Sequence, residues 1–316
     1  MTTSGDITYN PSVVEMITQA YRLLGVIAED EDPTGEMYAV ALFQLNAIVT
    51  AAQATGLHVW TEEEAVLFLQ SGQNEYVIGG PGTNDQCTDA SDWTQTQLTQ
   101  AAATATTTIN VSSIAGIASG DHIGIILDNQ ATFWTTVNGA PSGLTVTLTN
   151  PLPSISSAGN YVLDYTTAIS RPLKVPAARL LRLAGQFENP LNVLSRQEYM
   201  DLPNKASQGT PTNFFYSPRL DRGLLYVWPT PNTAPFAVRF TWYRPLQDFI
   251  NSTDTMDFPR EWVSPLLWNL CNDLMPLYET PPARQMLIMK NMEKYGDLAI
   301  SYDRESEPIQ FGVDYD

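Results

Sequence analysis

The feature that most constrains this chain is a long segment without any positively charged side chain. Residues 23–170 contain fifteen Asp and Glu residues and no Lys or Arg, and they account for most of the formal net charge of -18. Such a segment cannot neutralise phosphates, so we exclude a nucleic-acid clamp in the first half of the chain. Binding to an anionic membrane surface is excluded for the same reason.

The length and apolar content indicate a folded chain with more than one structural unit. The chain has 316 residues, of which 43% are hydrophobic and 10% aromatic, and single cores seldom grow beyond about 300 residues. The two cysteines, Cys87 and Cys271, are far apart in the sequence, and we interpret them as reduced thiols of a protein made in the cytoplasm. The polar segment Met1–Asn10 predicts a soluble protein without a secretory signal.

Helical patterns occur at both ends of the chain. Near the N-terminus, Ser12 and Glu15 have the spacing of a capping box, and the apolar stripe that follows ends at Gly25. Pro33 opens a second helix, whose apolar residues recur every three or four positions as far as Gly56. Two further helices are predicted near the C-terminus, one with the stripe Trp262, Leu266, Leu267, Leu270 and Leu274, and one that begins at Pro281 and Pro282.

The middle of the chain has the pattern of β structure. From residue 84 Thr becomes frequent and short alternating runs lie between Gly, Pro, Asn and Ser, which predicts an all-β insertion. A second β region follows from residue 166 and differs in carrying Arg and aromatic residues. The strand-like runs are Leu57–Trp60, Tyr76–Ile78, Thr107–Val111, His122–Leu127, Phe133–Val137, Leu144–Leu148, Tyr161–Tyr165, Phe214–Ser217, Leu224–Trp228 and Phe236–Tyr243.

These patterns predict an α+β fold. We expect a helical bundle made of the N- and C-terminal helices, with a central β region and a small all-β domain inserted in it. We assign the two β regions to different sheets, and the second region could pair with Leu57–Ile78. The predicted boundaries are 1–83 for the helical hairpin and first strands, 84–165 for the insertion, 166–256 for the second β region, 257–302 for the C-terminal helices and 303–316 for an acidic tail.

No residue pattern typical of catalysis is found. The two histidines, His58 and His122, are not near a nucleophile motif, and with two scattered cysteines no zinc-ligand spacing can be formed. There is no phosphate-binding glycine loop. We therefore predict a protein that is not an enzyme and needs no cofactor or metal.

Two acidic segments resemble sites in part, and we interpret both as surface features. Asp30, Asp32, Thr34 and Gly35 match the start of a calcium-binding EF-hand loop, but position 12 of that loop is Ala41 and cannot bind the ion. Acidic residues at a helix N-terminus are the simpler interpretation. Glu62–Glu64 is interpreted as a solvated acidic face, although one of its members could be an acid of raised pKa.

Two further sets of side chains leave alternatives open. Trp93 and Trp134 in the insertion could form a sugar-stacking platform, but one Trp in a small β domain is more often part of the core. The pairs Arg179 with Arg182 and Arg219 with Arg222 could bind a phosphate, or form salt bridges to the acidic segment of a neighbouring subunit.

The order of several short motifs resembles the head-to-tail adaptor proteins of short-tailed bacteriophages, of the tail accessory factor or packaged-DNA-stabilisation type. From the first to the last, these motifs span most of the chain outside the insertion, and the insertion itself resembles one found in longer members of that family. They are Leu45–Ile48, Gly56–Trp60, Ser71–Gly79, Arg171–Leu173, Tyr243–Pro245 and Phe258–Trp262.

The resemblance implies a structural connector of a virion, made in the host cytoplasm and without catalytic activity. The family arrangement is a ring of twelve copies between the portal protein and the tail or nozzle protein, with DNA passing through the channel without specific binding and no membrane contact. It also implies that the tail docks on the portal, with anchors at Tyr302, Ile309, Phe311, Val313 and Tyr315. Such alternation of apolar and acidic residues suits an extended peptide that adds to a partner's sheet.

Two classes of function agree with the sequence, and experiments can distinguish them. The first is the connector, which we expect to be monomeric or weakly associated in isolation and to form rings on the portal. The alternative is a tail component that binds or cleaves carbohydrate through the β insertion. A wall without cations would repel DNA over roughly 8 Å at physiological salt, so DNA could slide through a connector without sticking.

Overall fold

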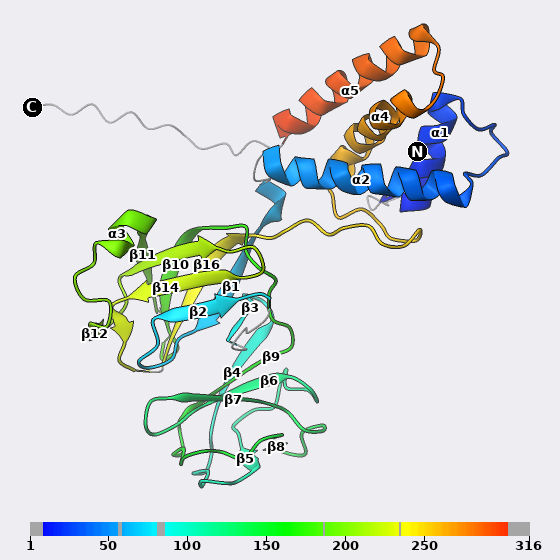
Figure 1. Ribbon diagram of the computed structural model, residues 1–316. Coiled ribbons are helices and arrows are strands. Elements are labelled where there is room, and N and C mark those ends of the chain that lie inside the picture. Colours follow the sequence, from blue (N-terminus) through cyan, green and yellow to red (C-terminus); the bar gives the residue numbers. More distant parts are fainter. Residues whose placement is uncertain (1–8, 56–58, 81–85, 186, 234, 303–316) are drawn as a thin grey trace, which may run out of the picture. The chain divides into compact units, whose positions relative to one another are not determined.

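The computed structural model describes residues 9–55, 59–80, 86–185, 187–233 and 235–302. The chain divides into two units, and each is described by itself. The helical unit contains the residues up to Thr61 and those from Leu246 onward, and the β unit contains Glu62–Pro245. The chain therefore leaves the helical unit once and returns to it once (Figure 1).

The predicted fold class is wrong. Strands contain 32% of the residues and helices 27%, and the largest assembly is a nearly closed sheet of eight described strands rather than a helical bundle. The predicted pairing of the second β region with the segment Leu57–Ile78 is confirmed, but the sheet that results, and not the helices, is the largest assembly of the chain. β1 (Glu62–Phe68) pairs with β16 (Phe236–Tyr243), and β2 (Glu75–Ile78) pairs with β14 (Gly223–Trp228).

The eight strands follow the spatial order β2-β14-β13-β11-β10-β16-β1-β3. The described pairings are antiparallel except for the short parallel contact between β11 and β13. A buried cluster that includes Tyr76, Phe214, Phe240 and Trp242 lines one face of this sheet. The remaining strands are β3 (Cys87–Asp89), β10 (Lys174–Arg182), β11 (Phe187–Val193) and β13 (Asn213–Pro218), and a separate pair is formed by β12 (Gln208–Gly209) and β15 (Thr230–Pro231).

Strand β1 begins with three glutamates, where the sequence predicted a solvated acidic face. Its first residues pair in register with β16, and Glu62 lies opposite Tyr243. The Arg244 guanidinium contacts the Glu63 carboxylate at 2.8 Å, and the Tyr243 hydroxyl donates to Glu62 at 3.3 Å. Glutamate is disfavoured in strands, and these contacts with Tyr243, the last residue of β16, and Arg244, the residue after it, stabilise the glutamates in β1. Before β1, the predicted strand Leu57–Trp60 is wrong for its described part, which forms the 3-10 helix η1 (Val59–Thr61).

The helical unit is built from both ends of the chain. α1 (Val13–Leu24) begins with the predicted capping box of Ser12 and Glu15, and it ends at Gly25 in the left-handed conformation with φ of 72°. Arg284, in the first turn of α5 (Pro282–Tyr302), donates to the carbonyl oxygen of Leu24 at 2.6 Å. A Cβ atom at Gly25 would collide with this guanidinium, so glycine is required both for the turn and for the contact.

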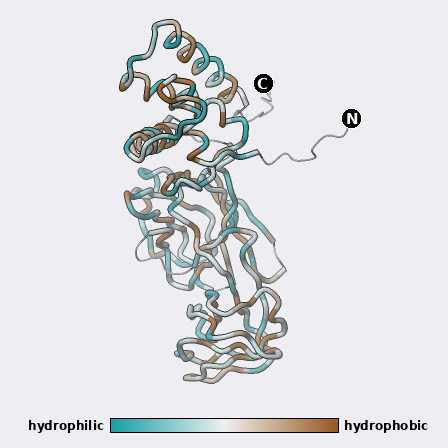
Figure 2. Tube along the Cα trace, turned by 90° about the vertical axis from the view of Figure 1, so that its right-hand side faces the viewer, coloured by the Kyte–Doolittle hydropathy of each residue, from teal (hydrophilic) through white to brown (hydrophobic). Residues whose placement is uncertain are grey.

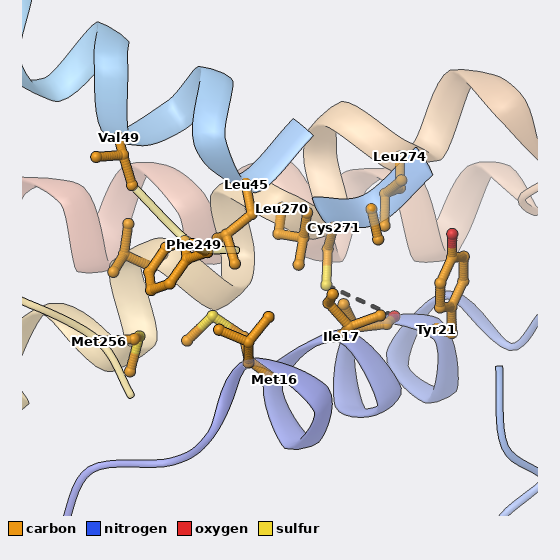
Figure 3. Packing of buried hydrophobic residues seen from close by; sticks show 14 of the residues in the cluster. Met16, Ile17, Tyr21, Leu45, Val49, Phe249, Met256, Leu270, Cys271 and Leu274 are labelled. Atoms are coloured by element: carbon orange, nitrogen blue, oxygen red, sulfur yellow. Dashed lines mark hydrogen bonds between the residues drawn. The ribbon is translucent and has the colours of Figure 1, made fainter. Parts of the chain in front are cut away.

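One apolar core joins the helices of this unit. α1, α2 (Gly35–Thr55) and α4 (Val263–Leu274) each contribute a buried stripe, and Phe249 and Met256 from the connecting segment complete it (Figure 3). The Cys271 thiol lies 3.8 Å from the carbonyl oxygen of Ala20. The Asn46 side chain fixes the connecting segment, because it donates to the Phe249 carbonyl at 3.0 Å and accepts from the Phe249 amide at 2.9 Å.

Shorter helical turns complete the described elements. α3 (Arg196–Met200) begins with a second capping box, formed by Ser195 and Glu198. The 3-10 helices η2 (Arg260–Trp262) and η3 (Met275–Leu277) precede and follow α4.

The insertion forms its own sheets within the β unit. A four-stranded sheet has the order β4-β9-β6-β7, and β5 pairs with β8. The five strands predicted in this segment are found at nearly the predicted residues, and apolar residues occur here as they do in the helices and the large sheet (Figure 2). The strands are β4 (Trp93–Gln97), β5 (Thr108–Asn110), β6 (His122–Ile126), β7 (Thr132–Thr136), β8 (Thr145–Thr147) and β9 (Tyr161–Tyr165).

An aromatic cluster connects the insertion to the large sheet. Phe68 of β1 is 1% exposed, and its ring centroid lies 5.5 Å from both Trp93 and Trp134 and 6.3 Å from Tyr165. Trp134 also lies against Gly124 on the neighbouring strand, where an added Cβ atom would come within 2.7 Å of the indole ring. The two parts of the β unit therefore share a buried apolar contact.

Candidate protein–protein interface

Helix α2 is far more apolar than its burial requires. Residues Gly35–Ala54 have a mean hydropathy of 1.3, yet 17% of this window is buried. By length and composition it is the one helix among the described residues that could cross a membrane. Its inner stripe of Ala41, Leu45 and Val49 lies in the core, whereas Phe43 on the opposite side is 71% exposed. The flanking residues Val40, Leu42 and Ile48 pack partly against the core, so Phe43 and the small residues beside it form the exposed apolar surface of α2. An exposed apolar surface on such a helix indicates a contact with a partner.

The exposed side of α2 forms a shallow groove of about 600 Å³, which we call the α2 groove. Small side chains form its floor, Phe43 is at one end, and Asp248 supplies a carboxylate from the connecting segment. The Asn46 amide lies in the groove, but its hydrogen-bonding atoms are used by Phe249. The lining residues are Phe43, Asn46, Ala47, Thr50, Ala51, Ala54 and Asp248.

Helix α5 has a second uncovered apolar surface. Ile288 and Ala299 are buried against the rest of the helical unit, while Leu287 is 54% and Leu298 56% exposed. Exposed lysines, Lys290 and Lys294, lie between these two leucines at intervals of three and four residues, which places all four on one side of the helix. We call this set, Leu287, Lys290, Lys294 and Leu298, the α5 stripe.

The sequence did not identify either surface. It gave the apolar residues of α2 as a single repeat of three or four positions, and it gave only the start of α5. The sequence does contain one indication of the surface on α2, because apolar residues between positions 37 and 54 occur on all sides of the helix. A helix that is hydrophobic all round must be covered on more than one side.

Two of the four arginines predicted to form inter-subunit salt bridges contact carboxylates of their own chain. Arg179 lies 3.7 Å from Glu64 and 3.6 Å from Glu188, and Arg222 contacts Asp221 at 2.7 Å. Arg182 lies over the Phe236 ring at 5.6 Å. Arg219 is in the hairpin between β13 and β14, whose Leu220 is 97% exposed, and its carbonyl accepts from Arg171 at 2.9 Å. A role between subunits stays a prediction for all four.

The predicted portal anchors cannot be placed. Ile309, Phe311, Val313 and Tyr315 lie outside the described residues. Tyr302 is the last residue of α5, and its side chain is outside the described part as well. The docking role of the tail stays a prediction.

The described histidine and the two cysteines lie in environments that suit packing rather than chemistry. His58 lies outside the described residues, and His122 stacks on Tyr165 with ring centroids 4.9 Å apart. Burial raises the pKa of the Cys87 thiol well above its usual value and that of Cys271 to about 12, so neither supplies a thiolate at neutral pH. Within the described ranges no group of three or more His, Cys, Asp or Glu residues could hold a metal ion.

The indole rings of Trp93 and Trp134 are half-buried and pack against other aromatic rings of the β unit. Both contact Phe68, and Trp134 also packs edge-on against Tyr165 at 5.7 Å. A sugar-stacking platform needs a ring face open to solvent. The contacts agree with the alternative interpretation of these two residues as packing groups.

The insertion contains one buried carboxyl group in an unfavourable environment. Asp164 of β9 is 2% exposed, and its Oδ1 has no hydrogen-bond partner among the described residues. By contrast, the Asp121 carboxylate accepts a hydrogen bond from the backbone amide of Ala118 at 2.6 Å. The Asp92 carboxylate accepts one from the backbone amide of Thr167 at 2.8 Å. Burial, and then the charges of Asp121 and Asp92, raise the pKa of Asp164 to about 7.

We therefore expect the stability of the β unit to depend on Asp164 between about pH 4 and pH 7. The folded-state pKa is above the unfolded one, so the folded state retains the proton more tightly, and this stabilisation is lost as the pH rises through the folded pKa. Asp164→Asn should raise the free energy of unfolding by about 2 to 4 kcal/mol at pH 8 and by much less near pH 4. Urea unfolding at a series of pH values measures the difference.

Asp128→Asn is the control, because hydrogen bonds from Ser157 lower the pKa of this exposed carboxyl group. The contribution of Asp128 is present at high pH and is lost as the pH falls, so its replacement should destabilise the protein at pH 8. An Asp164→Asn effect that does not change with pH would contradict the assignment.

Comparisons with known proteins give little overlap. No family model matches the chain, and no curated protein matches it. One partly similar solved structure is the Gp54 tailspike of Acinetobacter baumannii bacteriophage AP22 in complex with A. baumannii capsular saccharide, with 17% sequence identity and a TM-score of 0.23. The matched region covers 25% of this chain and 15% of the tailspike chain. A likeness of this extent carries no argument about function, and the adaptor resemblance stays a prediction.

Proposed function

We propose that this protein is a structural connector of a phage virion, a head-to-tail adaptor that assembles with copies of itself between the portal protein and the tail. The observation that carries the proposal is the helical unit, which is formed by both ends of the chain and leaves α2 and α5 with uncovered apolar faces. A monomeric protein rarely exposes apolar surface of this extent, whereas an assembly protein needs it.

The positions of the motifs support the proposal. One of the resembling segments, Tyr243–Pro245, ends where the chain returns to the helical unit, and side chains of this segment and of Phe258–Trp262 have structural contacts. Arg244, from Tyr243–Pro245, binds Glu63, and Phe258, from Phe258–Trp262, packs on Trp60 at 5.3 Å. The motifs thus include residues that hold the framework, as expected for a resemblance of architecture rather than of an active site.

The charge distribution also supports a conduit for DNA. Residues 23–170 include α2 and the whole insertion and contain no Lys or Arg. In a ring around DNA, such segments would repel phosphate and leave the DNA free to move. The carbohydrate-directed alternative has less support, because the two Trp residues considered for it pack against Phe68.

Portal binding is the test of this function. Mixing the full chain with the cognate portal protein should give a complex of one portal ring with a ring of this protein, and native mass spectrometry measures its mass. A chain that ends after Tyr302 should keep its melting temperature and lose portal binding, because the tail supplies the predicted anchors.

Full-length chains with changed tails separate the parts of this test. Replacing Ile309, Phe311, Val313 and Tyr315 by Ser should weaken portal binding as truncation does, whereas replacing Glu305 and Glu307 by Gln should weaken it less. Normal binding by the truncated chain would refute the tail assignment. Absence of binding by the unmodified chain at micromolar concentration would refute the proposed function.

A further inference from the structure

The α2 groove and the α5 stripe are complementary in shape and charge. The groove has a floor of small residues and one carboxylate, Asp248. The stripe presents two leucines for such a floor and two lysines beside them for such a carboxylate. Small side chains let a second helix approach closely, and opposite charges at the rim set its orientation.

The two surfaces of one copy do not cover each other. Phe43 at the end of the groove is 71% exposed and Leu287 on the stripe 54% exposed in the single chain. Both helices contact α4 through their other sides, where Leu45 and Ile288 are buried. The stripe that covers the groove must therefore come from another molecule.

A protein partner suits the groove better than a lipid. The Asp248 carboxylate lies in the groove, and transferring an unpaired carboxylate into hydrocarbon is costly. The opposite side of α2 is already buried in a protein core, as the contacts of Val49 and Leu45 show (Figure 3). A lysine-bearing helix would instead pair with the carboxylate while its apolar side chains fill the groove.

We infer that the α2 groove binds the α5 stripe of a second copy of this chain. The inference rests on the proposed function and names the surfaces through which the ring closes. Since the two surfaces differ, each copy offers one groove and one stripe, and the contact repeats from copy to copy. A contact between two α2 grooves would place two Asp248 carboxylates together with no cation from residues 23–170 to balance them.

Disulfide trapping with single-cysteine chains tests the pairing. Ala47→Cys in the groove and Leu287→Cys on the stripe are prepared separately, mixed at high concentration and oxidised. The native Cys87 and Cys271 are buried, so they should not form links. The mixture should give a covalent dimer on non-reducing gels, identified by mass spectrometry as the peptide pair containing residues 47 and 287. Each chain alone should give much less.

The controls show whether each result supports or contradicts the inference. Ala103→Cys, at an exposed alanine of the insertion, mixed with Leu287→Cys should stay monomeric. A dimer formed by Ala47→Cys alone, or the absence of the mixed dimer, would overturn the inference. Failure of portal binding while the mixed dimer forms would overturn only the proposed function, and portal binding without the mixed dimer would overturn only this inference.

A charge exchange gives a second measurement. Lys294→Glu in the stripe chain should lower the yield of mixed dimer by about two- to fivefold at low salt, and so should Asp248→Lys in the groove chain. Mixing the two changed chains should restore the yield, because the ion pair is re-formed with its signs reversed. An unrestored yield would show that Asp248 and Lys294 do not face each other.

Discussion

Replacement of Leu45 by Ala is expected to lower the free energy of unfolding of the helical unit by about 3 to 5 kcal/mol. Leu45 is fully buried in the core shared by α1, α2 and α4, so truncation removes apolar contacts and leaves a cavity. Urea unfolding followed by far-ultraviolet circular dichroism measures the change, since α1, α2, α4 and α5 all belong to this unit.

Phe43→Ala is the matched control on the same helix. Phe43 precedes Leu45 by two positions and is 71% exposed, so its loss should change stability by less than about 0.5 kcal/mol. The same replacement should reduce self-association if the α2 groove is an interface. Equal losses of stability for the two variants would show that the single chain does not have the packing described for α2.

Replacement of Phe68 by Ala is expected to destabilise the β unit by about 3 to 5 kcal/mol. Phe68 is 1% exposed and touches Trp93, Trp134 and Tyr165, so its removal leaves a cavity where the insertion meets the large sheet. Differential scanning calorimetry measures the stability, and near-ultraviolet circular dichroism should show a loss of aromatic signal because two indole rings lose their partner.

Phe187→Ala provides the comparison for this prediction. Phe187 is also a strand residue of the large sheet, but it is 69% exposed, so we expect a change within about 0.5 kcal/mol. A Phe68→Ala protein with unchanged stability would mean that the insertion does not depend on this aromatic cluster.

Local features of the fold were predictable where neighbouring residues determine them. The capping box of Ser12 and Glu15 and the helix end at Gly25 are found as predicted, because these interactions span only a few residues. The strands of the insertion were found for a similar reason, since their alternation and turn residues are strong local signals. Strand β1 was missed because three consecutive glutamates resemble a solvated surface until their partners are known.

The error in fold class has a definable cause. Strands β1 and β16 are almost the whole length of the β unit apart in the sequence, yet they pair along seven residues in register. Sequence periodicity indicated that these segments are extended and could pair, but it does not show how many strands join one sheet or that the sheet nearly closes. The helices were therefore assigned the organising role that the large sheet has.

The candidate interface could not be predicted from neighbouring residues in the sequence either. Apolar content alone does not separate Leu45, which is buried, from Phe43, which is exposed, because both occur on one hydrophobic helix. The packing of α1 and α4 on one side of α2 makes the distinction. In the same way, Arg179 was predicted as a cation for a neighbouring subunit, and the fold brings Glu64 and Glu188 of its own chain within 4 Å.

The amino-acid order thus settled the cation-free first half, the capped first helix, the helical segments near both ends and the short alternating strands, because each depends on composition or on contacts within a few residues. The tertiary structure decided that eight described strands form one nearly closed sheet, and that α2 and α5 keep an uncovered apolar side. Both outcomes depend on which distant surfaces meet, since burial and hydrogen-bond pairing are properties of pairs of segments rather than of either segment.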